Sequence, residues 1–471
     1  MPNRTNYNKI IVTGGNPMSL RNTFTSGLGL VALLALPLGF MNCQGATSTN
    51  NSTNQNANDN STSGCSASEL ANLETQMTQA LKSVAIEESV YLELRRNLDG
   101  RVFTLTRNDV TPPPPAPPRL DPPVTATTTL RSASTAKMVT ATVILDVISN
   151  PSLYPGNGMV NGKAFSLDSL AREFLPRPGG GTMWTNTTRA IPTNNRLYSV
   201  NLRHLLSFTS GLEKDNVSCI GSMTTTHNDC IPFVVNANVN IADNTNNVSR
   251  SFFYNGAHLF VAAQMAVNAS GLGSWAALFK RFKEVHGVFQ SSIPSPDADN
   301  MGVGAFYPNS SPSTTTSSSS PNPAGAMQYQ AGDYAPFLVK LANAQIISQA
   351  LLNEMMSDQM DTPNTFIKYS PMQDDEEEWP YGLGLWNECP VADFTLACLE
   401  DRYSSPGTFG SYPFVDFNLW DGTSYLFVGF VGRAGDTSAQ AIKGINFYRA
   451  MGGGKVGVKD LAQKWAANKC P

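Results

Sequence analysis

Residues 130–148 read LRSASTAKMVTATVILDVI, and this stretch determines the fold and the chemistry that we expect. From Met138 to Ile148 apolar residues lie on almost every side of the helical wheel, which predicts a helix buried inside the protein. Ser134 and Lys137 stand three residues apart at the start of this helix, so their side chains share one face and can meet. Burial lowers the proton affinity of a lysine, which can then act as a base toward a serine hydroxyl. The alternative interpretation is a serine helix cap followed by a solvated lysine.

The composition limits the classes of protein to which the chain can belong. Its 471 residues include 32 Lys and Arg against 36 Asp and Glu, a formal net charge of −4. A nucleic-acid-binding protein would show a basic excess, so we expect no nucleic-acid partner. Hydrophobic residues make up 41% of the chain, enough for a large core, so the chain is not disordered throughout.

The cysteines indicate disulfides rather than a metal site. The chain has seven cysteines and four histidines, and no two cysteines form a C-x-x-C pair, so we expect no metal. Cys219 with Cys230, and Cys389 with Cys398, are close in sequence. Such short separations suit disulfides that staple local loops in an oxidising compartment.

The N-terminal segment has the pattern of an export signal. Residues 28–40 (LGLVALLALPLGF) form an apolar run too short for a membrane span, and residues 1–42 therefore read as a signal peptide. The run ends just before Cys43 and resembles a bacterial lipoprotein signal, although Asn42 replaces the small residue of the strict motif. This resemblance implies a lipid anchor on Cys43, and hence an exported protein held to a membrane at the periplasmic face or the cell surface. A soluble exported protein cut nearby is the alternative.

A polar segment follows the lipidation candidate. Residues 44–63 (QGATSTNNSTNQNANDNSTS) contain no large apolar residue, so 43–65 are expected to be a lipidated cysteine and a flexible tether. If Cys43 carries lipid, six cysteines remain. Cys65 and Cys470 can then form a third disulfide that joins the two ends of the folded domain.

Residues 66–471 are expected to form one domain. Residues 90–96 and 101–107 alternate in polarity around Asp99-Gly100, which predicts a hairpin. Helical patterns occur at 68–84, 199–207, 257–269, 273–284, 333–343 and 346–357, strand patterns at 383–387, 412–419 and 424–431, and a closing helix near 438–450. Strands at both ends with helices between them predict an α+β, two-lobed α/β fold. It would have one antiparallel sheet built from both termini, flanked by helices, and an inserted helical region.

In several segments the chain resembles the serine β-lactamase-like superfamily, in its branch of class C β-lactamases, DD-peptidases and esterases. The stretch 130–148 resembles the nucleophile helix of that family. Further segments resemble those that follow it, in the same order: FSLDSLAREFLP (165–176), VNLRHLLSFTSGL (200–212), FFYNGAHLFVAAQMAVNASG (252–271), YGLGLW (381–386) and YSSPGTFGSYPFVD (403–416). The similarity covers about residues 69–450, in an order that isolated motifs rarely reproduce by chance.

The resemblance implies roles for individual residues. Ser134 would be the nucleophile, Lys137 its activating partner, and Tyr254 the phenol that passes the proton to the leaving group. Backbone N–H groups of Ser134 and Thr408 would form the oxyanion hole. The remaining substrate-binding candidates are Ser405, Gly407 and Asn255.

Three positions depart from the family pattern. The family asparagine usually stands two residues after the tyrosine, whereas here that position is Gly256 and Asn255 comes one residue early; either Asn255 fills the role or Phe253 occupies the tyrosine position. Phe208 replaces a common histidine. The third motif, normally Lys or His, then Thr or Ser, then Gly, reads Ser405-Pro406-Gly407, so the cation that binds a substrate carboxylate is missing.

These observations favour a lipid-anchored serine hydrolase that cleaves a small ester or amide through an acyl-enzyme on Ser134, without a cofactor. A β-lactamase or D-alanyl-D-alanine carboxypeptidase is the alternative within the same class. The alternative from another class is a non-catalytic surface lipoprotein that uses the fold as a binding scaffold.

Overall fold

The computed structural model describes most of the chain that follows the polar segment. The described residues are 64–83, 89–107, 123–185, 190–215, 217–220, 225–240, 250–291, 305–306, 321–360, 365–372, 379–388, 402–420, 423–433 and 458–470. They all belong to one unit, Thr62–Pro471. The predictions for the signal peptide, for Cys43, for the Cys389–Cys398 disulfide and for a helix near 438–450 fall outside these residues and stay predictions.

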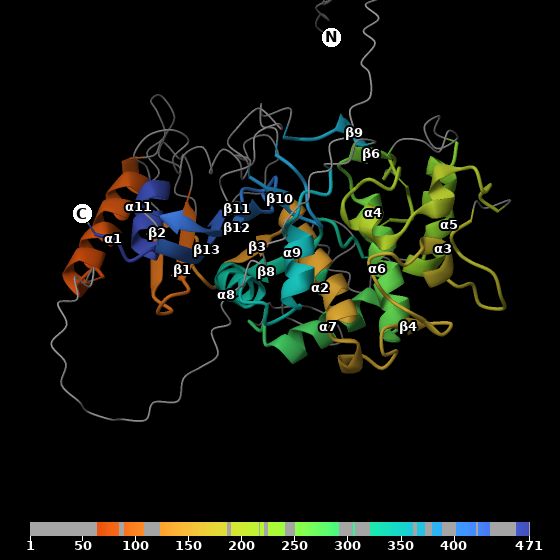
Figure 1. The fold of residues 1–471 in the computed structure, drawn as a ribbon, viewed down its shortest axis with the longest axis horizontal. Coiled ribbons are helices and arrows are strands. Elements are labelled where there is room, and N and C mark those ends of the chain that lie inside the picture. The colour runs from red at the N-terminus through yellow and green to blue at the C-terminus, as the bar shows by residue number, and fades with distance from the viewer. Residues whose placement is uncertain are drawn as a thin grey trace, which may run out of the picture. The chain divides into compact units, whose positions relative to one another are not determined.

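A six-stranded antiparallel sheet is built from both ends of the domain, as the sequence predicts (Figure 1). Its strand order is β10-β11-β12-β13-β1-β2. The strands are β1 (Val90–Arg96), β2 (Val102–Arg107), β10 (Trp386–Asn387), β11 (Arg402–Ser404), β12 (Tyr412–Trp420) and β13 (Thr423–Arg433). The first strand pairs with the last, with Leu92 opposite Val431, so the two halves of the chain meet in the middle of the sheet.

Helices cover both faces of this sheet. Helices α1 (Ala67–Ser83) and α11 (Val458–Ala466) lie on one face, where the Arg96 guanidinium stands over the Trp465 ring at 5.4 Å. Helix α8 (Ala331–Ala342) lies on the other, where Tyr334 stacks on Phe430 at 5.1 Å. Successive side chains of a strand point to opposite faces of the sheet. Phe430 is paired with Glu93 and shares its face, whereas Arg96, three residues after Glu93 in β1, points to the other face.

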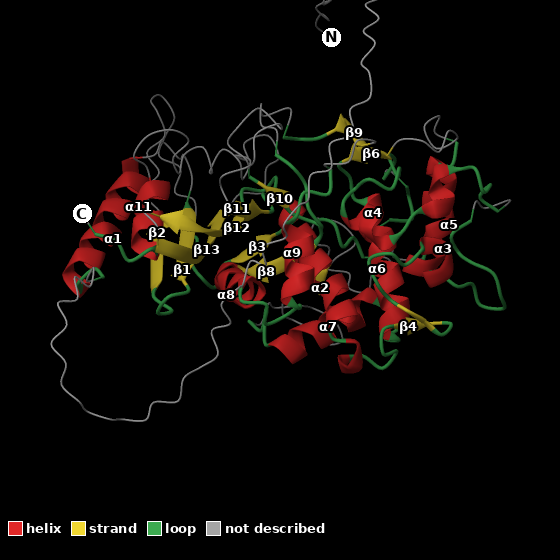
Figure 2. Ribbon diagram, in the orientation of Figure 1, coloured by secondary structure: helices red, strands yellow, loops and turns green. Residues whose placement is uncertain are grey.

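The inserted region between β2 and β10 is mainly helical (Figure 2). Its helices are α2 (Ala136–Ser149), α3 (Ala171–Phe174), α4 (Leu202–Leu206), α5 (His227–Asn238), α6 (Ala257–Ser270), α7 (Trp275–His286) and α9 (Gln349–Met356), with 3₁₀ turns η1 (Ala133–Thr135), η2 (Pro151–Leu153) and η3 (Arg196–Ser199). Helix α2 packs against α6 and α7, and every side chain from Ala136 to Val147 is buried. The apolar run of the sequence therefore forms the central buried helix that it predicts.

Short strands complete the inserted region. They are β3 (Thr129–Arg131), β4 (Met159–Val160), β5 (Lys163–Ala164), β6 (Arg250–Phe253), β7 (Ala305–Phe306), β8 (Met327–Gln330) and β9 (Thr365–Tyr369). Strand β8 pairs with β3, which leads into η1 and α2, and β6 pairs in parallel with β9. These small sheets hold the segments that enter the site described below.

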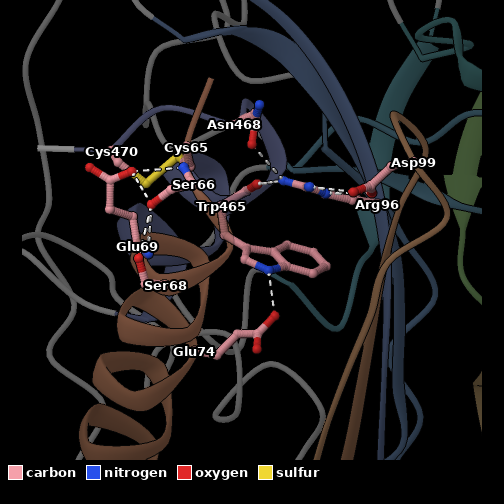
Figure 3. The surroundings of a disulfide bond; sticks show 10 residues. All are labelled: Cys65, Ser66, Ser68, Glu69, Glu74, Arg96, Asp99, Trp465, Asn468 and Cys470. Atoms are coloured by element: carbon pink, nitrogen blue, oxygen red, sulfur yellow. Dashed lines mark hydrogen bonds and ion pairs between the residues drawn. A yellow bond between two sulfur atoms is a disulfide. The ribbon is translucent and has the colours of Figure 1, made fainter. Parts of the chain in front are cut away.

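The two ends of the domain are joined covalently. Cys65, just before α1, and Cys470, just after α11, form a disulfide (Figure 3). Beside it, the Arg96 Nη1 donates to the Trp465 carbonyl at 2.7 Å, and the Trp465 indole N–H donates to Glu74 Oε1 at 2.9 Å. The expected pairing of Cys65 with Cys470 is thus present in the structure.

Two expected elements differ in the structure. The strand expected at 383–387 shortens to Trp386–Asn387, because the backbone N–H groups of Leu383 and Gly384 donate instead to Met355 and Leu206 of the helical region. The helix expected at 199–207 divides into η3 and α4, since Asn201 caps α4 by accepting from the His204 N–H. Among the described residues, no helix is long and apolar enough to cross a lipid bilayer.

Candidate active site

The turn before α2 presents Ser134 in a strained backbone. Ser132 fixes this turn to β8, because its N–H donates to the Met327 carbonyl at 2.8 Å and its Oγ accepts from the Met327 N–H at 3.0 Å. The next residue, Ala133, has a φ of 43°, in the left-handed region that a residue with a Cβ rarely adopts. Such a conformation costs about 1–3 kcal/mol and is found most often at functional sites. It turns the chain so that Ser134 lines a cavity rather than the core.

Lys137 contacts Ser134 from the first turn of α2. Its side chain is only 6% exposed, and its Nζ donates to Ser134 Oγ at 3.0 Å and to the Ala324 carbonyl at 2.8 Å. Among the described residues, no carboxylate forms an ion pair with it. Burial lowers the pKa of Lys137 to about 7, although the charge of Asp215 acts in the opposite direction. A large fraction of the Lys137 side chains is therefore in the neutral amine form at neutral pH.

Tyr254 covers the same nitrogen. Its ring centroid lies 4.8 Å from Lys137 Nζ, and its hydroxyl interacts with Ser134 and with the indole of Trp386. Burial raises the pKa of Tyr254 above its usual value, and these two hydrogen bonds offset only part of the rise. Of the two neighbouring aromatics that the sequence left open, Tyr254 is the one at the lysine, whereas the Phe253 ring packs on Tyr369.

An aromatic cluster holds Tyr254 in place. Its ring stacks on Trp386 at 5.3 Å and meets Phe208 edge-on at the same distance. Phe208, which stands where the family that the sequence resembles has a histidine, has a φ of 60°, and its carbonyl accepts the Phe253 N–H at 3.0 Å. The substitution therefore provides packing and backbone support beside the phenol.

The segment Ser405-Pro406-Gly407 packs against the backbone of the turn that carries Ser134. Ser405 Oγ donates to the Ser134 carbonyl at 2.8 Å. A Cβ added to Gly407 would lie 2.5 Å from the Ser132 carbonyl oxygen, so only glycine permits this close approach. The two residues predicted to bind substrate here thus lie against the turn, Ser405 through its hydroxyl and Gly407 through its backbone. Neither Ser405 nor Gly407 is among the described residues that line the cavity.

Thr408 lines the cavity together with Ser134. Among the described residues, none accepts a hydrogen bond from the Thr408 N–H. The two backbone positions expected to form an oxyanion hole therefore border one cavity, and their roles remain predictions.

The Asn255 side chain binds neighbouring backbone groups and is not among the described residues that line the cavity. Its Nδ2 donates to the Leu212 carbonyl at 2.6 Å, and its Oδ1 accepts the Ala257 N–H at 2.9 Å, at the start of α6. Gly256, in the place of the family asparagine, lines the cavity instead. Asn255 thus lies beside the site with both polar atoms engaged.

The cavity encloses about 600 Å³. Besides the residues above it is lined by Asp215, Val217, Ser218, Ile220, Asn322 and Phe409. Sequence reasoning missed Asp215 and Asn322. The one sequence signal for Asp215 is its place three residues after the Ser-Gly-Leu that ends segment 200–212. Asn322 lies near the end of a Ser- and Pro-rich stretch that contains no motif.

A disulfide borders this cavity. Cys219, between the lining residues Ser218 and Ile220, is bonded to Cys230 of α5. This pairing was expected, and the structure places it next to the site. In the described part of the chain, no group of three or more His, Cys, Asp or Glu side chains gathers as metal ligands would.

Comparisons with known proteins place this geometry in a known fold. No protein-family model and no curated protein matches the chain. Among solved structures it resembles SurE with D-Leu, at 13% identity and a TM-score of 0.52 over 86% of this chain and 78% of that one. It also resembles D-amino acid amidase from Ochrobactrum anthropi SV3 complexed with L-phenylalanine, at 17% identity and a TM-score of 0.50 over 85% and 99%. A penicillin binding protein from Bacillus halodurans aligns at 14% identity and a TM-score of 0.47, over 80% and 100%.

Likeness at these identities establishes the architecture alone. The mixed α/β arrangement, with an antiparallel sheet assembled from both ends and an inserted helical region, is the one expected from the sequence. The chain therefore has the β-lactamase/transpeptidase-like fold.

Proposed function

We propose that the chain is a serine hydrolase that cleaves an ester or amide through an acyl-enzyme on Ser134. One observation carries the proposal. The buried Lys137 Nζ lies 3.0 Å from Ser134 Oγ and has no carboxylate partner among the described residues. An amine whose pKa is lowered to about 7 can accept a proton at neutral pH, which is what a serine nucleophile needs.

The proposed reaction has two halves. As Ser134 Oγ bonds to the carbonyl carbon, its proton passes to the neutral Lys137 amine, and the N–H groups of Ser134 and Thr408 stabilise the oxyanion. The tetrahedral intermediate then expels the leaving alkoxide or amine, which takes the Tyr254 phenolic proton, and the Lys137 ammonium returns a proton to the phenolate. Water attacks the acyl-enzyme next and gives a proton to the same pair. The bond between the carbonyl carbon and Ser134 Oγ then breaks, the pair returns the proton to Ser134 Oγ, and the acid is released.

The direction of the two pKa shifts supports this division of labour. Burial lowers the pKa of Lys137 and raises that of Tyr254. Groups whose pKa values are pushed apart commonly serve as base and acid, respectively. Lys137 is therefore assigned the base and Tyr254 the acid.

The proposed substrate is an ester or amide whose leaving group carries no carboxylate. The missing cation at Ser405 argues against a β-lactam or a peptidoglycan stem, whose carboxylate would be unpaired there. A β-lactamase or DD-carboxypeptidase activity is thus the second choice, and a non-catalytic scaffold the third.

The test is the intact mass of the full chain after exposure to a fluorophosphonate, which reacts with activated serines. We expect one adduct on the unmodified chain and none on Ser134→Ala. The matched control is Ser218→Ala, which removes another hydroxyl from the same cavity wall and should keep the adduct.

No adduct on a folded sample would overturn the hydrolase and favour the scaffold. An adduct retained by Ser134→Ala would assign the nucleophile elsewhere.

We also propose that Cys43 carries a lipid. The support is the apolar run at 28–40 and the polar segment that follows it. Metabolic labelling with a fatty-acid analogue should mark the unmodified chain and not Cys43→Ala. Labelling that persists in the variant would contradict the anchor.

A further inference from the structure

The charged side chains that line the cavity indicate which charge a bound substrate can carry. Two of the described lining residues are charged, Lys137 and Asp215. Lys137 is engaged with Ser134 Oγ and the Ala324 carbonyl. The charge that the described lining presents to a bound molecule is therefore the Asp215 carboxylate.

The loop that carries Asp215 is fixed by a buried side chain. Asn238 of α5 is fully buried, and its Oδ1 accepts the N–H groups of Glu213 and Lys214, each at 2.8 Å. Its Nδ2 donates to the Lys214 carbonyl at 3.1 Å. The backbone just before Asp215 is thereby held on three atoms.

The other side of this loop is fixed covalently. The Cys219–Cys230 disulfide joins it to the same helix, α5. Asp215 Oδ2 also accepts the Gly256 N–H at 3.2 Å, which orients the carboxylate. Among the described residues, no cation pairs with Asp215, whose side chain is exposed to the cavity.

The carboxylate lies on the wall that bears the proposed base. A Cβ built on Gly256 would lie 3.8 Å from Asp215 Oδ2 and 3.4 Å from the Ala324 Cβ. The carbonyl of Ala324 in turn accepts from Lys137 Nζ. One small residue, without a side chain of its own, therefore separates the carboxylate from the reacting groups.

Apolar side chains stand beside this carboxylate. Val217 and Ile220 follow it along the same loop, and Phe409 lines the cavity next to Thr408. A ligand that fits these walls has a positive charge next to an apolar group, with no negative charge at the third motif.

We propose that Asp215 binds an ammonium group on the acyl part of the substrate. The substrate class is then an ester or amide of an acid that bears a free amine beside an apolar side chain. This inference rests on the proposed hydrolysis at Ser134 and adds a specificity-determining residue to it.

The first test compares two substrates that differ in one charge: leucine p-nitroanilide and N-acetylleucine p-nitroanilide, each as both enantiomers. The readout is the ratio of their kcat/KM values, because any effect of a variant on Lys137 cancels in the ratio. We expect the unmodified chain to favour the free amine, and Asp215→Asn to reduce that preference roughly tenfold.

Asparagine keeps the acceptor for the Gly256 N–H and removes only the charge. The matched control is Asp168→Asn, an exposed carboxylate outside the described lining, which should leave the ratio unchanged. An equal ratio in the unmodified chain and in Asp215→Asn would overturn the inference, as would a preference for the acetylated substrate.

The second test does not need turnover. Calorimetry would measure the binding of leucinamide and of N-acetylleucinamide to the full chain with Ser134→Ala, and to the same chain with Asp215→Asn added. Tighter binding of leucinamide that is lost on adding Asp215→Asn supports the inference. Equal binding of the two amides, or no binding of either, overturns it.

The two proposals can fail separately. A fluorophosphonate adduct with no discrimination between the paired substrates would leave the hydrolase standing and remove the role of Asp215. Discrimination in binding without any adduct would retain an amine-binding cavity and remove the hydrolase.

Discussion

Two of the buried cations that stand over an aromatic ring, Lys137 and Arg96, differ in the type of cation and in its partners. In the cavity, Lys137 is 6% exposed and stands 4.8 Å from the Tyr254 ring, with hydrogen bonds to a hydroxyl and a carbonyl. At the joined chain ends, Arg96 is 3% exposed and stands 5.4 Å from the Trp465 ring (Figure 3). Arg96 also forms an ion pair with Asp99, whose pKa it lowers to about 2.

The type of cation and its partner together explain the different consequences of burial. A buried guanidinium that has an anionic partner recovers in attraction much of what it loses in hydration, and the pair fixes structure. A buried amine without one gives up its proton more readily. Arg402, also buried, follows the first pattern, since its Nε donates to Asp416 at 2.8 Å behind the third motif. A buried amine without an ion pair thus suits the role of base proposed for Lys137, whereas a buried guanidinium paired with a carboxylate suits a structural role.

The largest effect is expected from removing the reactive cation. Lys137→Met keeps the length and apolar stem of the side chain and deletes the amine, so kcat should fall by about 10³-fold or more while circular dichroism still reports a folded chain. Turnover of leucine p-nitroanilide is the measurement. A loss of less than tenfold would mean that Lys137 is structural, and the comparison with Arg96 would collapse.

The pH dependence of the unmodified chain checks the same residue. Lys137 must be neutral to accept a proton, and the neutral fraction grows as pH rises through its pKa of about 7. With N-acetylleucine p-nitroanilide, which has no titrating amine, kcat/KM should therefore rise about tenfold between pH 6 and pH 8 and then level off. The residual activity of Lys137→Met should lack this rise, and an unmodified profile centred near pH 10 would contradict the assignment.

A smaller effect, on a different quantity, is expected from the structural cation. Arg96→Met leaves the Trp465 carbonyl without its donor and removes the ion pair with the exposed Asp99, and should lower the free energy of unfolding by about 1–2 kcal/mol. Urea unfolding at fixed temperature would measure this loss. The kcat per folded molecule should be unchanged, and a fall in kcat at full folding would break the division between the two cations.

The sequence predicts the parts of the molecule that depend on local pattern. The apolar run of α2, the spacing of Ser134 and Lys137, and the hairpin of β1 and β2 are encoded within short windows, and each is present. The sheet built from both termini follows from the places of the strands along the chain.

Features that depend on distant contacts were not predictable in the same way. Helix α5 contains Pro232, which hides its helical pattern, and its Asn238 is what fixes the loop of Asp215. The choice between Phe253 and Tyr254 needed the contacts of the two rings, because the two positions are adjacent and both aromatic. Helix α11 was not among the expected helices, although its residues follow an amphipathic pattern.

The Cys65–Cys470 bond has a mechanical consequence. It closes the folded domain into a covalent ring spanning a sequence separation of 405 residues, with both exits from the ring at the same point. A pull applied between the two chain termini passes through the sulfur–sulfur bond and bypasses the sheet, the cavity and every helix. Tension applied at the two ends of the domain would therefore leave Ser134, Lys137 and Tyr254 in position until the bond is reduced.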